Sequence, residues 1–338
     1  MKVAFFSTKP YDIPGFRKAA EGTGLELKFY ESRLTEDSAQ LASGYDAICV
    51  FVNDNLDAKV IDRLYQCGVR LIALRCAGYN HADIEHAAGK IGIVHVPAYS
   101  PYAVAEHAMA MLLTSVRRIH KAYNRTREFN FSLNGLTGFD LHGKTVGVIG
   151  IGKIGSVFGD ICRGFGMHTI AYSKTAKKDT PFEFVSLDEL YARSDIISLH
   201  CPLTPETENL INKQAIEKMK KGVILLNTSR GNLIDTDALI DGLKDRKIGA
   251  ACLDVYAEEG NLFYNDYSGH IVNDDKLTRL ISMPNVLVTG HQAYLTEEAL
   301  SNIADTTVSN ILTYFSGKEI CENELVFKDG RIEHRKQE

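Results

Sequence analysis

The chain has 338 residues, which is enough for two domains with separate hydrophobic cores. Apolar residues make up 45% of the sequence and charged residues 24%, as in an ordinary soluble globular protein. The net charge of -5 gives no electrostatic reason to expect nucleic acid or an anionic membrane as a partner, and no stretch approaches the roughly 20 apolar residues of a membrane span.

The cysteines and histidines narrow the class of protein further. Seven cysteines occur without a C-x-x-C motif, which is typical of reduced thiols in a cytoplasm rather than of a disulfide framework. The histidines lack the paired spacing of a zinc site, so no metal is expected. A basic cluster is interpreted as a solvated helix face, with a phosphate-binding surface as the alternative; it contains Arg117, Arg118, Lys121, Arg125 and Arg127.

The first hundred residues alternate between strand-like and helix-like segments, which favours a parallel sheet with crossover helices. The predicted strands are Val3–Phe6, Leu25–Tyr30, Ala47–Phe51, Arg70–Leu74 and Ile93–Val96. The predicted helices are Gly15–Gly22, Asp57–Gly68 and Asp83–Lys90. The pattern breaks between Pro97 and Pro101, where we expect the chain to cross into a second domain, and a long helix follows at about Tyr102–Arg118.

A second α/β unit begins at Lys144. Its predicted strands are Thr145–Ile149, Thr169–Tyr172, Ile196–Leu199, Val223–Asn227, Ala250–Leu253 and Val286–Val288, and its predicted helices include Ser186–Ser194, Asn212–Met219 and Thr236–Lys244. Gly260–Leu280 is expected to be an irregular insertion, and Thr296–Ser316 a helix that leaves this unit. The predicted fold class is α/β, with two doubly wound parallel-sheet domains over residues 1–101 with 298–338 and over residues 102–297.

A glycine-rich turn, Gly150-Ile151-Gly152-Lys153-Ile154-Gly155, lies between the predicted strand Thr145–Ile149 and a predicted helix. A strand, a G-x-G-x-x-G turn and a helix in this order are typical of dinucleotide binding. The first glycine permits the tight turn, the second lets the backbone approach a pyrophosphate, and the third lets helix and strand pack closely. The helix N-terminus then offers free N–H groups to the phosphates.

Three strands of the second unit are followed by side chains that carry chemistry. Arg230 follows Val223–Asn227, Asp254, Glu258 and Glu259 follow Ala250–Leu253, and His291 follows Val286–Val288. Ligands of open α/β sheets bind at these carboxyl ends. Hydride transfer from a nicotinamide to a 2-oxo acid needs a cation for the substrate carboxylate, a proton donor for the developing alkoxide, and a carboxylate that orients the donor and favours its protonated form.

The sequence resembles the D-isomer-specific 2-hydroxyacid dehydrogenases, and within that family its D-lactate branch. The matching stretches run almost from end to end and include Leu74-Arg75-Cys76-Ala77-Gly78, Val96-Pro97-Ala98-Tyr99, Ala105-Glu106-His107, the glycine turn, Leu199-His200-Cys201-Pro202, Asn227-Thr228-Ser229-Arg230-Gly231, Asp254-Val255-Tyr256 and Gly290-His291-Gln292-Ala293. The Gly260–Leu280 insertion and the stretch Cys321 to Leu325 favour the D-lactate branch. The resemblance implies a flavodoxin-like substrate domain, a Rossmann nucleotide domain, and reduction of pyruvate to D-lactate by NADH.

The resemblance also implies roles for individual residues. Arg230 matches the substrate-clamping arginine, His291 the acid/base and Glu259 its partner, so these three are the predicted catalytic residues. The backbone around Ala77 and Gly78 matches the stretch that binds the substrate carboxylate, with Tyr99 nearby, and Tyr294 would wall the pocket against larger substrates. The predicted cofactor contacts are Gly150, Gly152, Lys153, Ile154, Gly155, Ser173, Cys201, Pro202, Thr228, Ser229 and Asp254. The family is homo-oligomeric through its nucleotide domain, so a dimer or tetramer is expected.

One position departs from the fingerprint. An acidic residue is expected at the end of the second strand, about 20 residues past the glycines, where it binds the ribose 2′-OH. Ser173 stands there, followed by Lys174, so NAD is expected but NADP stays open, because serine does not repel a 2′-phosphate and lysine attracts one. Two rival functions are a dehydrogenase for bulkier 2-oxo acids and a non-catalytic NAD-sensing scaffold of the same fold.

Overall fold

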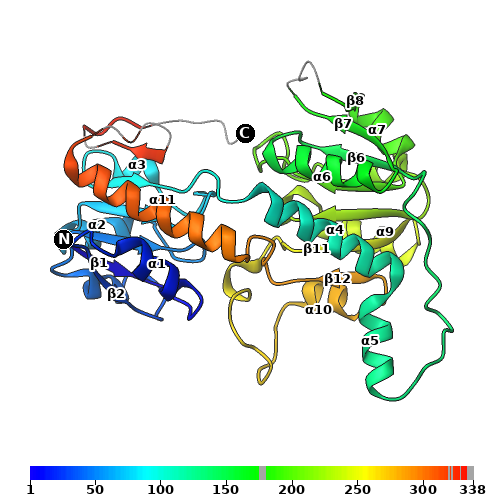
Figure 1. Cartoon of the computed structure of the whole chain (residues 1–338), viewed down its shortest axis with the longest axis horizontal. Coiled ribbons are helices and arrows are strands. Elements are labelled where there is room, and N and C mark those ends of the chain that lie inside the picture. Colours follow the sequence, from blue (N-terminus) through cyan, green and yellow to red (C-terminus); the bar gives the residue numbers. More distant parts are fainter. Residues whose placement is uncertain (175–179, 319, 321–322, 328, 333–338) are drawn as a thin grey trace. The chain divides into compact units, whose positions relative to one another are not determined.

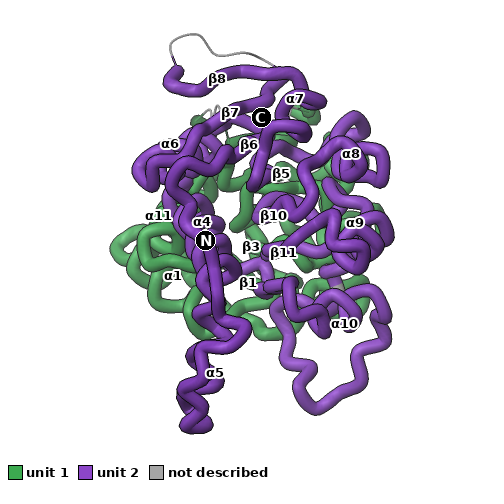
Figure 2. The backbone as a smooth tube through the Cα atoms, turned by 90° about the vertical axis from the view of Figure 1, so that its right-hand side faces the viewer, with its two compact units in different colours: residues 1–100, 295–336 green, residues 101–294, 337–338 purple. Residues whose placement is uncertain are grey.

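The computed structural model describes residues 1–174, 180–318, 320, 323–327 and 329–332 (Figure 1). It divides the chain into two compact units, one containing Met1–Ser100 and Leu295–Lys336 and the other containing Pro101–Tyr294 (Figure 2). We call them unit 1 and unit 2.

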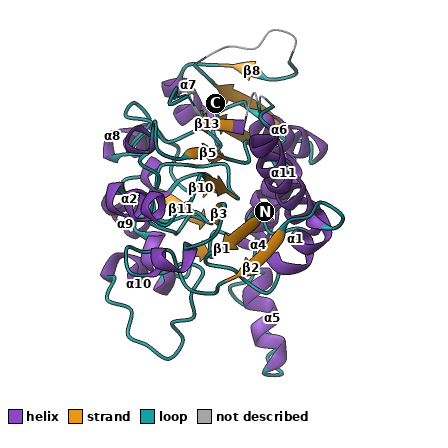
Figure 3. Cartoon of the chain, turned by 90° about the vertical axis from the view of Figure 1, so that its left-hand side faces the viewer, coloured by secondary structure: helices purple, strands orange, loops and turns teal. Residues whose placement is uncertain are grey.

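Unit 1 is built on a six-stranded sheet with the order β13-β5-β4-β3-β1-β2. Its elements are β1 (Lys2–Phe5), α1 (Asp12–Ala20), β2 (Glu26–Phe29), β3 (Ala47–Val50), α2 (Ala58–Gln66), β4 (Leu71–Leu74), α3 (Ile84–Ala87), β5 (Gly92–Val94), α11 (Glu297–Ser316) and β13 (Glu324–Val326). The first five strands are parallel in the flavodoxin-like order 2-1-3-4-5. Helices α1 and α11 cover one face and α2 the other (Figure 3).

Unit 2 contains a seven-stranded parallel sheet with the order β12-β11-β10-β9-β6-β7-β8. Its elements are α4 (Pro101–Arg117), α5 (Ile119–Arg127), β6 (Thr145–Ile149), α6 (Lys153–Gly164), β7 (His168–Tyr172), β8 (Glu183–Phe184), α7 (Leu187–Arg193), β9 (Ile196–Leu199), α8 (Lys213–Lys218), β10 (Val223–Asn227), α9 (Thr236–Lys244), β11 (Ile248–Leu253), α10 (Asp275–Ser282) and β12 (Val286–Val288). The direction of strand addition reverses at β6, so the order is that of a Rossmann fold.

Alternation along the buried strands explains why helices pack on both faces of this sheet. Ile149, Ile197 and Leu225 belong to a core with α7, α8 and α9, whereas their neighbours Val148, Ile196 and Ile224 belong to a core with α4 and α6. Successive side chains of a strand point to opposite faces, so continuous apolar strands need helices on both. Figure 2 shows α8 and α9 on the side of the sheet opposite α4 and α6.

The fold class predicted from the sequence is confirmed, and β6, β9, β10 and β12 have the predicted bounds. The prediction of an irregular Gly260–Leu280 segment is wrong in part, because α10 begins at Asp275, where the Asp274 side chain caps it by accepting a hydrogen bond from the Leu277 N–H. Strand β13, which the sequence analysis did not predict, pairs antiparallel with β5. A short strand β8 and the separate helix α5 were also missed.

A buried carboxylate organises the carboxyl ends of the strands in unit 1. Asp54 is 1% exposed and accepts hydrogen bonds from the Ser7 hydroxyl and from the N–H groups of Leu34 and Phe51, each at 2.7 Å. Arg75 is buried beside it and donates to the carbonyls of Phe6 and Ser7. These contacts connect the segments after β1, β2, β3 and β4, because Ser7, Leu34, Phe51 and Arg75 follow these four strands in turn.

Replacing Asp54 should therefore destabilise the protein. Asp54→Ala would leave two buried N–H groups without acceptors and would remove a buried negative charge near Arg75, which should cost about 3–5 kcal/mol of unfolding free energy. Asp62→Ala is the matched control, because Asp62 is half-exposed and forms a surface ion pair with Lys90. Urea unfolding should show a large fall in the midpoint for Asp54→Ala and little change for Asp62→Ala. Equal effects would contradict the structural role of Asp54.

Candidate active site

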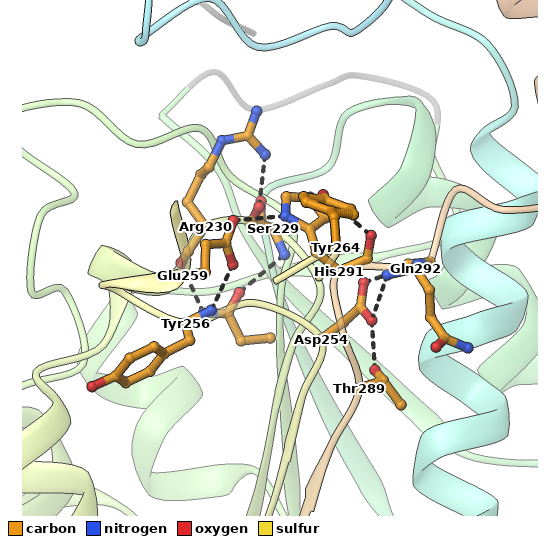
Figure 4. A network of polar contacts seen from close by, with 11 residues as sticks. Ser229, Arg230, Asp254, Tyr256, Glu259, Tyr264, Thr289, His291 and Gln292 are labelled. Atoms are coloured by element: carbon orange, nitrogen blue, oxygen red, sulfur yellow. Dashed lines mark hydrogen bonds and ion pairs between the residues drawn. The ribbon is translucent and has the colours of Figure 1, made fainter. Parts of the chain in front are cut away.

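The three strands predicted to carry catalytic residues are neighbours at one end of the unit 2 sheet. Strand β10 pairs with β11, and β11 pairs with β12, all in parallel, so their carboxyl ends share one edge. The segments after them are also joined: the Asp254 N–H donates to the Asn227 carbonyl, and the His291 N–H donates to the Asp254 carbonyl at 2.7 Å. Figure 4 shows the resulting network of polar contacts.

His291 and Glu259 form a close pair in this network. The His291 Nδ1 lies 2.7 Å from the Glu259 Oε1, and the two side chains are 18% and 20% exposed. The other carboxylate oxygen of Glu259 accepts a hydrogen bond from the Tyr256 N–H at 2.9 Å. Because the carboxylate occupies Nδ1, it fixes the ring orientation and leaves Nε2 as the nitrogen that can exchange a proton with a substrate.

Asp254 holds the backbone that carries His291. Its carboxylate is fully buried and accepts hydrogen bonds from the Thr289 hydroxyl and from the N–H groups of Gln292 and Ala293. Burial alone would raise the pKa of Asp254, but hydrogen bonds from His107, Thr289 and the two N–H groups outweigh it and hold that pKa below its usual value. The carboxylate is therefore ionised, and its hydrogen bonds hold the chain on both sides of His291, whose own backbone is strained.

That strain is visible in the dihedral angles. His291 has φ +53°, in the left-handed region that non-glycine residues seldom adopt. Tyr264, with φ +69°, donates its hydroxyl to the His291 carbonyl at 3.4 Å, and the two rings lie 5.9 Å apart. Strained conformations of this kind persist where surrounding contacts over-determine them, and they cluster at functional sites.

Arg230 brings a positive charge to the same edge. The side chain is half-buried and donates from Nη1 to the Ser229 carbonyl at 2.7 Å. Among the described residues, no carboxylate forms an ion pair with its guanidinium, which extends away from the Asp254 carboxylate in Figure 4. A half-buried guanidinium without a protein counter-ion is suited to bind a carboxylate ligand through two parallel hydrogen bonds.

Gly231 explains how the Arg230 segment reaches its neighbour. A Cβ added at Gly231 would lie 2.1 Å from the Tyr256 carbonyl carbon, so the segment after β10 packs directly on the backbone of the segment after β11. Only glycine permits this approach. The same contact brings Arg230 beside the stretch that leads to Glu259, and the structure thus assembles the three predicted catalytic residues in one part of unit 2.

The glycine turn after β6 has the features that a bound dinucleotide requires. A Cβ at Gly155 would lie 2.0 Å from the Gly150 carbonyl oxygen, so close packing of the turn demands glycine there. A Cβ at Gly152 would meet nothing within 4 Å, so internal packing does not demand glycine at that position. The space is consistent with a pyrophosphate approaching the backbone at the N-terminus of the twelve-residue helix α6.

Two further predicted cofactor contacts, Thr228 and Ser229, directly follow β10. The hydroxyl of Thr228 is buried and has no hydrogen-bond partner among the described residues, which is an unsatisfied donor that a ligand could use. The Ser229 hydroxyl donates to the Cys201 carbonyl at 2.8 Å, so the segment after β10 is tied to the segment after β9. These residues and the open Gly152 turn fit NAD.

The predicted substrate residues are divided between the units. Ala77, Gly78 and Tyr99 belong to unit 1, and Tyr294 is a buried residue of unit 2. The Ala77 carbonyl lies 3.0 Å from the Nδ1 of His95, and the Tyr99 carbonyl accepts from the Asn302 side chain at 2.7 Å. Contacts inside unit 1 thus fix the backbone of these segments.

Other titratable groups near the glycine turn are poor candidates for chemistry. Burial lowers the pKa of His200 to about 3, so this imidazole is neutral at physiological pH. Burial also raises the pKa of the Cys201 thiol to about 11, so it is not a thiolate nucleophile. Within the described ranges, no cluster of three histidine, cysteine or acidic side chains could hold a metal ion. No described helix is both long and apolar enough to cross a membrane.

Sequence reasoning missed three residues of this network, namely His107, Tyr264 and Thr289. The His107 Nε2 lies 3.4 Å from Asp254 Oδ1 and 3.2 Å from the Thr289 hydroxyl. His107 stands on α4, far from Asp254 in the sequence, and Tyr264 stands in the segment expected to be irregular. The only available signals were the Ala105-Glu106-His107 motif and the aromatic content of Gly260–Leu280, and neither identifies a contact partner.

Comparison with known proteins is consistent with this geometry. The sequence profile of the "D-isomer specific 2-hydroxyacid dehydrogenase, NAD binding domain" matches residues 109–293. A 2-hydroxyacid dehydrogenase homolog of Haemophilus influenzae is 52% identical, covering 96% of this chain and 98% of that protein. The D-lactate dehydrogenase of Escherichia coli is 50% identical over 96% of this chain and its own full length.

A solved structure matches the fold of this chain over nearly its whole length. The structure of the pyruvate reductase of Chlamydomonas reinhardtii has a TM-score of 0.91 and 44% identity, covering 95% of this chain and 98% of that one. The profile covers residues 109–293, and the sequence relatives and the solved structure agree with this chain over nearly its whole length. The chain therefore belongs to the family of D-isomer-specific 2-hydroxyacid dehydrogenases and contains its NAD-binding domain.

Proposed function

We propose that this protein is an NAD-dependent D-lactate dehydrogenase that reduces pyruvate. The observation that carries the proposal is the 2.7 Å contact between His291 and Glu259, on the same sheet edge as an Arg230 guanidinium without a carboxylate partner among the described residues. The names of the Escherichia coli and Chlamydomonas relatives support pyruvate and D-lactate as the reactant pair.

In this proposal each residue performs one task. When bound at the glycine turn, NADH would supply the hydride that the ketone carbon accepts. Arg230 binds the substrate carboxylate and polarises the carbonyl group. His291 donates the proton from Nε2 to the developing alkoxide, while Glu259 stabilises the positively charged ring. Asp254 keeps the His291 backbone in place, and Ala77, Gly78, Tyr99 and Tyr294 retain the substrate-binding roles predicted from the sequence.

The proposed activity is tested by initial rates of NADH oxidation with three substrates, pyruvate, 2-oxobutyrate and phenylpyruvate, followed by a stereospecific assay of the product. We expect kcat/KM to be highest for pyruvate and the product to be D-lactate, because Tyr294, a buried residue, is predicted to wall the pocket against larger side chains. A preference for phenylpyruvate would favour the bulkier-substrate alternative. An absence of NADH oxidation with all three acids would favour the non-catalytic scaffold.

The role of the histidine–carboxylate pair can be tested with neighbouring variants. Glu259→Gln keeps the shape of the side chain but removes the charge that stabilises protonated His291, so kcat/KM for pyruvate should fall by about 10²-fold. Glu258→Gln is the control, because Glu258 is exposed and adjacent in sequence. Equal values of kcat/KM in Glu259→Gln and Glu258→Gln would contradict the pairing.

We also propose that the protein is a homo-oligomer, and that it works in the cytoplasm, where its described cysteines, all free thiols, would stay reduced. Helix α5 has no buried residue, and the segment after it exposes Phe129, Phe131 and Leu133 at 84%, 70% and 79%. Arg125 fixes this segment by donating to the Asn134 carbonyl at 2.7 Å. Ordered, exposed apolar side chains of this kind support contact with a second copy of the chain.

Charge substitution on this segment should dissociate the oligomer. The double variant Phe131→Asp and Leu133→Asp would place two carboxylates in the proposed interface, so sedimentation or light scattering should give a lower molar mass than for the unchanged protein. Ile271→Asp is the control, because Ile271 is 88% exposed in the same unit but lies outside the segment. A wild-type protein with the mass of one chain would refute this part of the proposal.

A further inference from the structure

We propose that Glu206 sets the preference of this enzyme for NAD over NADP, replacing the acidic residue that is missing at Ser173. The inference rests on the proposed function, because it concerns the cofactor of that site. Glu206 would act on specificity alone, at the ribose end of the cofactor and away from the reacting atoms.

The sheet topology brings the relevant segments together. Strand β6, which leads into the glycine turn, pairs with β7 on one side and with β9 on the other. Ser173 and Lys174 follow β7, and Glu206 lies in the segment after β9. The carboxyl ends of the three parallel strands share an edge, and in this fold the adenosine ribose binds at the end of the strand equivalent to β7.

A direct contact connects the two segments. The Lys174 Nζ lies 3.6 Å from the Glu206 Oε2, so the lysine that would attract a 2′-phosphate already faces a carboxylate. The same oxygen accepts a hydrogen bond from the Thr204 hydroxyl at 2.6 Å. That hydrogen bond, together with the charge of Lys174, holds the pKa of Glu206 below its usual value, so the carboxylate is ionised.

Glu206 also stands on an ordered turn. The Thr204 N–H donates to the Thr207 hydroxyl at 2.7 Å, and that hydroxyl donates to the Pro202 carbonyl at 2.7 Å. The turn is therefore fixed directly after Pro202, a predicted cofactor contact. The hydrogen bond from the Thr204 hydroxyl gives the Glu206 carboxylate an attachment to this turn in addition to its ion pair with Lys174.

Charge then discriminates between the two cofactors. A 2′-phosphate carries between one and two negative charges near neutral pH, so Glu206 repels it and competes with it for Lys174. A ribose 2′-hydroxyl is neutral and does not experience this repulsion, and Ser173 can still form a hydrogen bond with it. Specificity here comes from a repulsive element on a neighbouring segment rather than from an acid at the strand end.

The direct test compares binding of adenosine 2′,5′-bisphosphate with binding of 5′-AMP by calorimetry. These probes carry the adenosine ends of NADP and NAD, so no turnover is needed. In Glu206→Gln the affinity for the bisphosphate, relative to AMP, should rise about three- to tenfold. Glu208→Gln is the matched control, because Glu208 is an exposed glutamate of the same turn without a described ion pair. Lys177 and Lys178 lie outside the described residues and are unchanged in every variant.

Two additional measurements sharpen the test. Adding Lys174→Gln to Glu206→Gln should remove the part of the gain that comes from the freed lysine and leave the part that comes from the lost repulsion. The gain should also shrink at about 1 M salt, where charges are screened beyond about 3 Å. An unchanged affinity ratio in Glu206→Gln, or an equal change in Glu208→Gln, would overturn the inference.

Fluorescence titration with NADH separates this inference from the proposed function. If the wild-type protein binds NADH and the ratio of the two adenosine probes does not respond to Glu206→Gln, the inference alone fails. If the wild-type protein binds neither NADH nor 5′-AMP, the proposed function fails and the inference fails with it.

Discussion

The buried carboxylate of Asp254 is the constraint on which the site depends. A fully buried charge is costly unless every lone pair is satisfied, and here Thr289, Gln292 and Ala293 supply the donors. Those donors all belong to the segment after β12, so ionised Asp254 ties that segment to the end of β11. The left-handed backbone of His291 is tolerated because the contacts on either side of it are already fixed.

The rest of the arrangement follows from the parallel sheet of unit 2. One end of the sheet, β10 to β12, presents Arg230, Glu259 and His291, while the middle, β9, β6 and β7, presents the glycine turn and the segments around it. Parallel strands place all their carboxyl ends on one edge, so residues far apart in sequence meet there. The Ser229–Cys201 hydrogen bond joins the two regions, and close backbone approach at Gly231 joins the segments after β10 and β11.

Much of this was predictable from sequence. The apolar strands and the glycine turn follow from local patterns, and β10 and β12 have the predicted bounds, so the positions of Arg230 and His291 at strand ends were secure. Helix α10 was missed because it has only eight residues and follows directly on a stretch rich in polar and aromatic residues, so the cap at Asp274 and the buried Leu277 and Leu280 did not stand out. Strand β13 was missed because antiparallel pairing with a distant strand has no local signature.

The unpredicted parts of the site have a common cause. His107, Tyr264 and Glu206 take their meaning from partners that are distant in sequence, and a side chain's type does not reveal which charge or backbone group it will face. The ion pair between Lys174 and Glu206 illustrates this, since the sequence showed only that an acid was missing at Ser173. Spatial neighbours, not spacing along the chain, decide such electrostatic roles.

The central claim is that Arg230 and His291 act together on one small 2-oxo acid. A crystal structure of the protein with NADH and oxamate, an unreactive analogue of pyruvate, would test it most directly. The account predicts the oxamate carboxylate on the Arg230 guanidinium and the His291 Nε2 within hydrogen-bond distance of the analogue's carbonyl oxygen, with Glu259 still on Nδ1. Oxamate bound in contact with neither side chain would contradict the account.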